Sequence, residues 1–385
     1  MEFLPFALPD IGEEEILEVS DSLRSGWITT GPKAKKFESD FTAFLGDPAV
    51  QSISVNSATS GLHLALEALG IGPGDEVVVP TYTFTATAEV VRYLGAKPIM
   101  VDVDANTFNI CPERFSNAIS EQTKAVIVVH FAGLACDMDA ILSIAKKNNV
   151  KVVEDAAHAL PTTYKGKLVG TLDSDFTVFS FYANKTMTTG EGGMVVTRNP
   201  ELASRCRIMR LHGISRDAFD RYTSNKPAWF YEVVAPGYKY NMPDISAAIG
   251  IHQLRRLPEF HAKRVKMASF YKERLSGLPL ELPPSAPSGD AHALHLYPVR
   301  IGHDAGLSRD KFIENMAALG VGCSVHFIPL HVHPYWRDTY KLAPSMFPVA
   351  HAIFEQEVTL PLYTKMTEKD LEKVVAAVKR VLGDA

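Results

Sequence analysis

The segment Lys151-Val152-Val153-Glu154-Asp155-Ala156-Ala157-His158 decides how the rest of the chain is interpreted. It begins as a short apolar strand of the kind that is buried on both faces, and it ends in two acids and a histidine. Similar apolar runs recur along the first two thirds of the chain, at residues 77–80, 98–103, 125–129, 177–182 and 193–197. Helix-like segments such as 138–147 lie between them. This alternation predicts an α/β fold in which helices cover a mixed, mostly parallel sheet.

The chain changes character after about residue 245. A helical pattern from near Asp244 to about Leu275 is followed by a proline-rich turn region at 278–287. A last helix is predicted because Thr367 can cap it with Asp370 three residues on. Its buried stripe is expected at Leu371, Val374, Val375, Val378 and Leu382. We therefore expect a large domain over residues 1–250 and a smaller C-terminal α+β domain over residues 251–385.

Composition and charge limit the classes of function. The 385 residues carry a formal net charge of −5, which gives no reason to expect a nucleic-acid partner. Four dispersed cysteines without a Cys-x-x-Cys pair argue against a disulfide framework or a zinc knuckle, and they fit a reducing cytoplasm. No apolar run has the length of a membrane span, and no secretory signal is visible. We expect a cytoplasmic protein that binds neither nucleic acid nor a membrane.

The acids that end the first segment point to a ligand site. Open α/β sheets bind ligands beyond the carboxyl ends of their strands, and Asp155 lies at such an end. A carboxylate there could keep a proton on a heterocyclic nitrogen, which is what the electron sink of pyridoxal phosphate (PLP) requires. The alternative is an acid that caps a helix or pairs with a surface base.

A lysine follows the next predicted strand along the chain. Lys185 comes three residues after the apolar, aromatic segment Phe179-Ser180-Phe181-Tyr182, so it is expected to be partly buried. Burial lowers the pKa of an amine and makes it more nucleophilic toward an aldehyde. An ordinary turn lysine is the alternative. The glycines at 190, 192 and 193 suit a tight turn, and they do not form a P-loop because the lysine precedes them.

The third feature is Asn56-Ser57-Ala58-Thr59-Ser60-Gly61, where Thr59 opens a helical pattern. Free backbone N–H groups and the helix dipole favour an anion such as a phosphate at this position. Ser and Thr are also common helix caps that need no ligand. Each feature alone is weak, but the order of phosphate cradle, acid and lysine is specific.

These motifs resemble the DegT/DnrJ/StrS family of PLP-dependent nucleotide-sugar aminotransferases, which share the aspartate-aminotransferase architecture (fold type I). The likeness runs nearly end to end. It is carried by residues 26–32, 74–77, 80–87, 154–158, 180–185, 189–193, 236–244, 325–331 and 360–362.

The resemblance implies three catalytic residues. Lys185 would hold PLP as a Schiff base and move the proton between the α-carbon of the amino donor and the C4′ atom of the cofactor. Asp155 would pair with the pyridine nitrogen, and His158 would lie near the ring or its phenolic oxygen.

Further contacts are implied by the same family. Phe84 would stack on the ring, while Ser57, Ala58, Thr59, Ser60 and Ser180 would surround the phosphate. Asn241 would come from a partner subunit, which makes a homodimer the smallest active unit, with apolar surface around residues 230–250 in its interface. Thr29, Tyr240 and His326 would contact the substrate. His326, His331 and His333 are close in sequence, but no metal is expected because they lack an acidic or cysteine companion.

The expected reaction moves an amino group from L-glutamate, which leaves as 2-oxoglutarate, to a nucleotide-linked keto-sugar. His158 and the loop at 238–244 favour amination at C4, so the acceptor is expected to be a 4-keto-6-deoxyhexose or a 4-keto-pentose. The product would be an amino sugar for a lipopolysaccharide, another surface glycan or a secondary metabolite. The segment Ser215–Glu232 is either a cover over the sugar nucleotide or a plain surface loop.

Three alternatives remain at this point. A PLP-dependent sugar dehydratase of the same fold has histidine in place of the lysine, so Lys185 argues against it. A non-catalytic regulator would not need the complete set of Asp155, His158, Ser180 and Lys185. A nicotinamide dehydrogenase would need a Gly-x-Gly-x-x-Gly motif after an early strand, and none is present.

Overall fold

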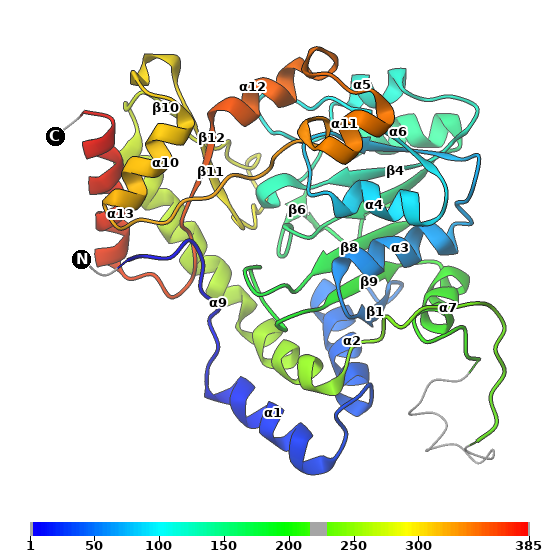
Figure 1. The fold of residues 1–385 in the computed structure, drawn as a ribbon. Coiled ribbons are helices and arrows are strands. Elements are labelled where there is room, and N and C mark those ends of the chain that lie inside the picture. The colour runs from blue at the N-terminus through cyan, green and yellow to red at the C-terminus, as the bar shows by residue number, and fades with distance from the viewer. Residues whose placement is uncertain (1–2, 216–228, 384–385) are drawn as a thin grey trace.

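The computed structural model describes residues 3–215 and 229–383, and Figure 1 shows two lobes joined by a long helix. Most of the segment Ser215–Glu232, for which a substrate cover was one expectation, therefore lies outside the described residues. Within them, no helix is both long enough and apolar enough to cross a membrane.

A seven-stranded sheet forms the centre of the larger lobe. Every neighbouring pair from β8 to β3 is parallel, and only β9 runs against its two neighbours. The predicted mixed, mostly parallel sheet is confirmed. Six strands consequently end at the same edge, where ligands of open α/β sheets bind. The spatial order is β1 (Gln51–Val55), β9 (Gly193–Thr197), β8 (Phe176–Ser180), β5 (Lys151–Asp155), β4 (Thr123–Val129), β2 (Glu76–Pro80) and β3 (Lys97–Val101).

Helices cover both faces of this sheet. One face packs against α2 (Pro32–Leu45), α6 (Met138–Asn148) and α9 (Asp244–Leu275). The other packs against α3 (Ala58–Ala68), α4 (Ala86–Tyr93) and α7 (Pro200–Met209). Side chains alternate along a strand, so Val152 of β5 joins the first core and Val153 the second. Double burial explains why the strands read as unbroken apolar runs.

The smaller lobe is an α+β unit, as predicted. Its antiparallel sheet consists of β10 (Leu280–Glu281), β11 (Tyr297–Ile301) and β12 (Glu357–Leu360), covered by α10 (Arg309–Ala318) and α13 (Glu368–Val381). Thr367 and Asp370 form the predicted capping box of α13. The N-terminal segment also belongs here, because Leu4 lies in the core of this lobe.

Helix α9 links the two lobes. Its first half contributes to the core under the large sheet, and its second half contributes to the core of the small lobe. The chain thus passes from one core to the other within a single helix, and the division at residue 250 stays a prediction. Helix α1 (Glu13–Ser25) lies along α9 (Figure 1).

The remaining elements are short. The hairpin of β6 (Thr163–Tyr164) and β7 (Lys167–Leu168) precedes β8, and α5 (Pro112–Asn117) packs beside α6. Helices α11 (Pro334–Tyr340) and α12 (Pro348–Gln356) return to the large lobe, where Trp336 and Ile353 are buried. Four 3-10 turns complete the described chain: η1 (Phe131–Gly133), η2 (His303–Ala305), η3 (Leu330–Val332) and η4 (Pro344–Met346).

Candidate active site

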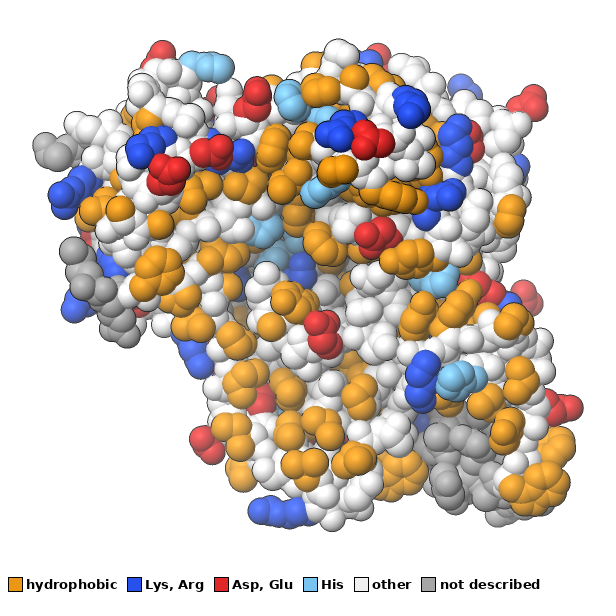
Figure 2. All heavy atoms as spheres, in the orientation of Figure 1, with side chains coloured by type: hydrophobic (Ala, Val, Ile, Leu, Met, Phe, Trp, Pro, Cys, Tyr) orange, Lys and Arg blue, Asp and Glu red, His pale blue; other side chains and the backbone are white. Residues whose placement is uncertain are grey.

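A cavity of about 390 Å³ lies at the carboxyl edge of the large sheet, where the small lobe closes over it. Its size falls within the range of small-molecule and cofactor sites. In Figure 2 this face is hollowed near its centre, and histidine and basic side chains lie at the bottom of the hollow. Eleven cofactor or substrate contacts were expected besides Thr29 and Asn241. Nine of these eleven line the cavity: Ser57, Ala58, Thr59, Phe84, Asp155, His158, Ser180, Lys185 and His326.

Asp155 ends β5 and points into the cavity. Its carboxylate accepts hydrogen bonds from the Thr87 hydroxyl at 2.9 Å and from the Ala157 N–H at 3.2 Å. Burial raises the pKa of the carboxyl, and no cation is paired with it among the described residues. A buried carboxyl without an ion pair is costly, so this position favours a ligand that brings a protonated nitrogen.

Lys185 reaches the cavity from the turn after β8. Burial lowers the pKa of its amine to about 8, although the nearby Asp155 opposes that shift. The Nζ atom has no hydrogen-bond partner in the described part of the chain. A substantial neutral fraction near pH 8 makes it a nucleophile and a proton carrier.

His158 lies on the same wall of the cavity, and its neutral ring can donate a hydrogen bond. Its Nδ1 accepts the backbone N–H of Ala132 at 3.2 Å, so the ring proton must be on Nε2. Burial, together with Lys185 and His326, holds the pKa of the ring well below its usual value. The remaining Nε2–H can therefore donate to an oxygen in the cavity.

The first turn of α3 forms the part of the cavity wall that was expected to hold a phosphate. The helix begins at Ala58 with Ser57 as its N-cap, one residue before the predicted start at Thr59. The Ser57 hydroxyl accepts the Ser60 N–H at 3.1 Å. A Cβ at Gly193 would lie 2.9 Å from the Ala58 nitrogen, so this glycine lets the helix start approach β9 closely. Thr59 and Ser180 add hydroxyls to the cavity wall.

Four expected contacts lie outside the cavity of their own subunit. The Ser60 hydroxyl is buried in the cap, where it donates to the Asn56 side chain at 2.8 Å. Asn241 donates to the Thr30 hydroxyl at 2.6 Å, and the Tyr240 hydroxyl bonds His63 at 3.1 Å. Thr29 is exposed. Their roles as ligand contacts stay predictions, and for Asn241 a place outside the cavity fits the expected contribution to a partner subunit.

The small lobe supplies two histidines and an aromatic side chain. His326, for which a substrate contact was predicted, lines the cavity, and burial lowers the pKa of its ring to about 3. His295 and Phe327 also line it, and both pack against His158, with ring centroids 4.4 and 5.7 Å away. Sequence reasoning did not select His295 or Phe327, because neither follows a strand of the large sheet. His331, in contrast, is fully buried elsewhere against Thr81.

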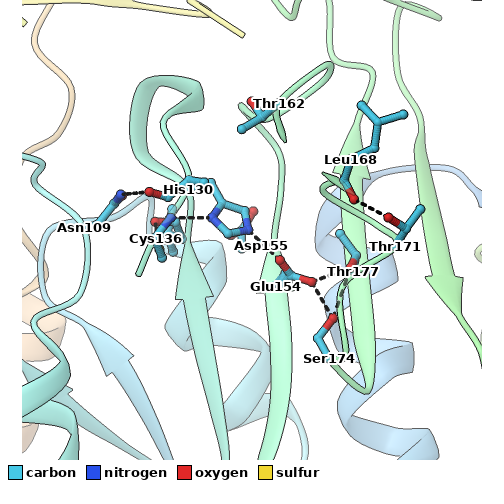
Figure 3. A network of polar contacts seen from close by, with 12 residues as sticks. Asn109, His130, Cys136, Glu154, Asp155, Thr162, Leu168, Thr171, Ser174 and Thr177 are labelled. Atoms are coloured by element: carbon cyan, nitrogen blue, oxygen red, sulfur yellow. Dashed lines mark hydrogen bonds and ion pairs between the residues drawn. The ribbon is translucent and has the colours of Figure 1, made fainter. Parts of the chain in front are cut away.

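A buried polar network fixes the end of β5, as Figure 3 shows. His130 Nδ1 accepts the Cys136 N–H at 3.1 Å, so its Nε2 donates to Glu154 at 2.8 Å. Glu154 also accepts the Thr177 hydroxyl at 2.8 Å. The His130 N–H donates to the Asp155 carbonyl at 3.2 Å. The network thus holds both Asp155 and the η1 turn, which carries the N–H that orients His158.

This donor set fits PLP. The α3 N-terminus and two hydroxyls suit a phosphate, Asp155 suits a pyridinium nitrogen, and Lys185 suits the aldehyde carbon. Phe84 stands at the mouth, 6.1 Å from Phe327, in a position to cover a ring.

The fold and the site together define a fold-type-I PLP enzyme. The family model described as the DegT/DnrJ/EryC1/StrS aminotransferase family matches residues 9–379, and the chain belongs to this family. It is therefore an enzyme of the PLP-dependent sugar aminotransferase class.

Relatives match over almost their whole length. The chain is 50% identical to the uncharacterized protein MJ1066 of Methanocaldococcus jannaschii, over 99% of this chain and 98% of that one. It is 44% identical to the spore coat polysaccharide biosynthesis protein SpsC of Bacillus subtilis, over 100% and 98% of the two chains. A solved structure of the putative sugar aminotransferase Spr1654 from Streptococcus pneumoniae, in its PMP form, superposes with a TM-score of 0.92 at 36% identity, covering 99% of each chain.

Proposed function

We propose that the enzyme transfers the amino group of L-glutamate to a nucleotide-linked keto-sugar, with a 4-keto-6-deoxyhexose or a 4-keto-pentose as the acceptor. The observation that carries the proposal is the meeting of three groups in one cavity: the α3 N-terminus, Asp155 and Lys185. Retention of the lysine supports amino transfer over dehydration. His158 and the loop at 238–244 support C4 as the site of amination.

The residues of the chain divide the work. Bound PLP supplies an electron sink for the carbon that loses its proton. With PLP bound, Asp155 would keep the ring nitrogen protonated, and His158 Nε2–H would donate to the phenolic oxygen. Lys185 Nζ takes the proton from the α-carbon of the donor and returns one when the sugar carbon is aminated. The small lobe covers one side of the cavity and excludes water there, which strengthens these interactions.

A role in surface polysaccharide synthesis is part of the proposal. The relative from Bacillus subtilis carries the name of a spore coat polysaccharide biosynthesis protein and covers the whole chain. We therefore propose that the product is an amino sugar used to build a surface glycan.

A homodimer is proposed as the active unit. Apolar side chains are exposed on α1 (Ile16, Leu17, Leu23), and the gathering of orange side chains on the lower front of Figure 2 lies over this helix. Val233 and Val234, in the expected interface region, are also more than half exposed. A large exposed apolar surface marks an interaction site. The position of Asn241 outside its own cavity supports a site completed by the second copy.

The test combines absorbance and turnover. Purified protein loaded with PLP should show a yellow band that bleaches when L-glutamate is added, and it should aminate one member of a panel of UDP-, dTDP- and GDP-linked keto-sugars. In Lys185→Ala the absorbance band should no longer lie at its wild-type position, and turnover should be lost. Lys124→Ala, at the opposite edge of the same sheet, is the matched control and should keep both. Full transamination by Lys185→Ala, or loss of water from the sugar without amination, would overturn the proposal.

A further inference from the structure

Strand β12 carries a polar pair that the site described above does not use. All four of its residues are buried, and two of them, Glu357 and Thr359, are polar. Because side chains alternate along a strand, these two share one face, while Val358 and Leu360 pack into the core of the small lobe. A buried acid needs specific partners, and those of Glu357 lead to the cavity.

The contacts form a chain that ends at His326. The His326 N–H donates to Glu357 Oε2 at 2.8 Å, and the Thr359 hydroxyl lies 2.5 Å from Glu357 Oε1. The same hydroxyl is 2.9 Å from His326 Nδ1. His326 lines the cavity, and its other ring nitrogen, Nε2, has no partner within residues 3–215 and 229–383. Nε2 is therefore the ring atom left for a ligand.

The Thr359 hydroxyl has one proton, which allows two arrangements. With Glu357 protonated, the carboxyl donates to Thr359, Thr359 donates to Nδ1, and the ring proton of His326 is on Nε2. With Glu357 ionised, Thr359 donates to the carboxylate, so Nδ1 must carry the ring proton and Nε2 becomes an acceptor. The state of the acid is thus transmitted to the cavity without any change in the charge of the histidine.

We propose that Glu357 and Thr359 are positioning residues that set the tautomer of His326, and thereby decide whether Nε2 donates to or accepts from the substrate. The proposal rests on the proposed function only in making the bound partner of Nε2 an oxygen of the amino donor or of the sugar. The relay itself depends on contacts within the chain.

The surrounding charges favour the donor arrangement at neutral pH. Burial raises the pKa of the Glu357 carboxyl to about 8, opposed by its contacts with Thr359 and His326 and by Arg309. The pKa of the His326 ring near 3 keeps the ring neutral in either arrangement. Other groups that face the pair are Tyr82, Cys323 and, across the β11–β12 ladder, Arg300; on the cavity side they are Lys185, His158 and His295.

Substitutions can hold the relay in one arrangement. In Glu357→Gln the amide oxygen can accept the His326 N–H while the NH₂ donates to Thr359, which fixes the proton on His326 Nε2 at every pH. Thr359→Val removes the hydroxyl with little change in shape. Thr359→Ser keeps the hydroxyl and is its matched control.

The first experiment is ¹⁵N-histidine NMR of the PLP-free and the PLP-loaded protein from pH 6 to 10, with His326→Asn assigning the signals. In the wild type and in Thr359→Ser, the proton of His326 should move from Nε2 to Nδ1 as pH rises through about 8. It should stay on Nε2 in Glu357→Gln, and Thr359→Val should lose the pH dependence. A pH-independent tautomer in the wild type, or unchanged behaviour in Glu357→Gln, overturns the proposal.

The second experiment separates KM from kcat. If Nε2–H binds the carboxylate of the donor, KM for L-glutamate should rise several-fold above pH 8 in the wild type and in Thr359→Ser but not in Glu357→Gln. If it binds the sugar, the same pattern should appear in KM for the keto-sugar. A wild-type pattern in Glu357→Gln for both substrates counts against the relay. Failure of the proposed function would remove turnover from all variants and leave the NMR result standing.

Discussion

Two histidines face the cavity from opposite lobes, and they are oriented by different kinds of partner. His158, on the wall of the large lobe, has its Nδ1 bound by a backbone N–H. His326, on the wall of the small lobe, has its Nδ1 bound by a hydroxyl. A backbone N–H can only donate, so it fixes one tautomer, whereas a hydroxyl can donate or accept. The comparison teaches that the contact of His158 in the large lobe allows one tautomer, whereas the contact of His326 in the small lobe allows two.

The largest effect is expected for a substitution of Asp155, the acid on the large-lobe wall of the cavity. Asp155→Asn keeps the size of the side chain and its contact with Thr87 but removes the negative charge that, in the proposed function, holds the ring nitrogen of PLP protonated. We expect kcat to fall about 10²- to 10³-fold, the equivalent of roughly 3–4 kcal/mol of transition-state stabilisation. Single-turnover kinetics with L-glutamate would measure it. A change of less than threefold would show that Asp155 does not act on the nitrogen.

A smaller effect is expected at His158. His158→Gln retains a side-chain donor for the proposed bond to the phenolic oxygen of PLP, whereas His158→Ala removes it and leaves the Ala132 N–H without its His158 acceptor. We expect about a 10-fold loss of kcat/KM in the alanine variant, and less in the glutamine variant, from a hydrogen bond worth roughly 1–1.5 kcal/mol. The fixed tautomer further predicts that the His158 ¹⁵N signals stay constant from pH 6 to 10. Titration of His158 in that range would break the contrast with His326.

The smallest effect concerns stability. The pKa of Glu357 is about 8 in the folded protein and near 4.5 as an ordinary glutamate, so the folded state holds this proton more tightly. Its contribution to stability is complete below about pH 4.5 and is lost as pH rises to about 8. Thermal melts should therefore show the wild type losing a few degrees relative to Glu357→Gln between pH 5 and pH 8. Parallel curves for the two proteins would contradict the raised pKa.

The sequence predicted strands correctly where the strands consist of uninterrupted apolar residues. Six strands of the large sheet (β2, β3, β4, β5, β8 and β9) were predicted because burial on both faces requires uninterrupted apolar runs, and a ligand site at the carboxyl ends was expected from the topology. Strand β1 was not predicted, since Ser52 and Ser54 alternate with its apolar residues. Both serines are buried, and Ser54 is satisfied by Glu38 from α2 at 2.8 Å. The local sequence pattern of β1 cannot predict that Glu38, a residue of α2, will bind Ser54.

Sequence alone determined the fold class and the positions of the α3 start, Asp155 and Lys185 beside the carboxyl ends of the strands, because strand ends and helix starts are local consequences of polarity. The roles expected for these groups came from the family resemblance. Only the tertiary structure decided which groups orient the histidines. Glu357 and Thr359 follow His326 by 31 and 33 residues, and His158 depends on a backbone N–H 26 residues earlier. Hydrogen bonds are directional and act over about 3 Å, so such partners meet only once the tertiary structure of each lobe has formed.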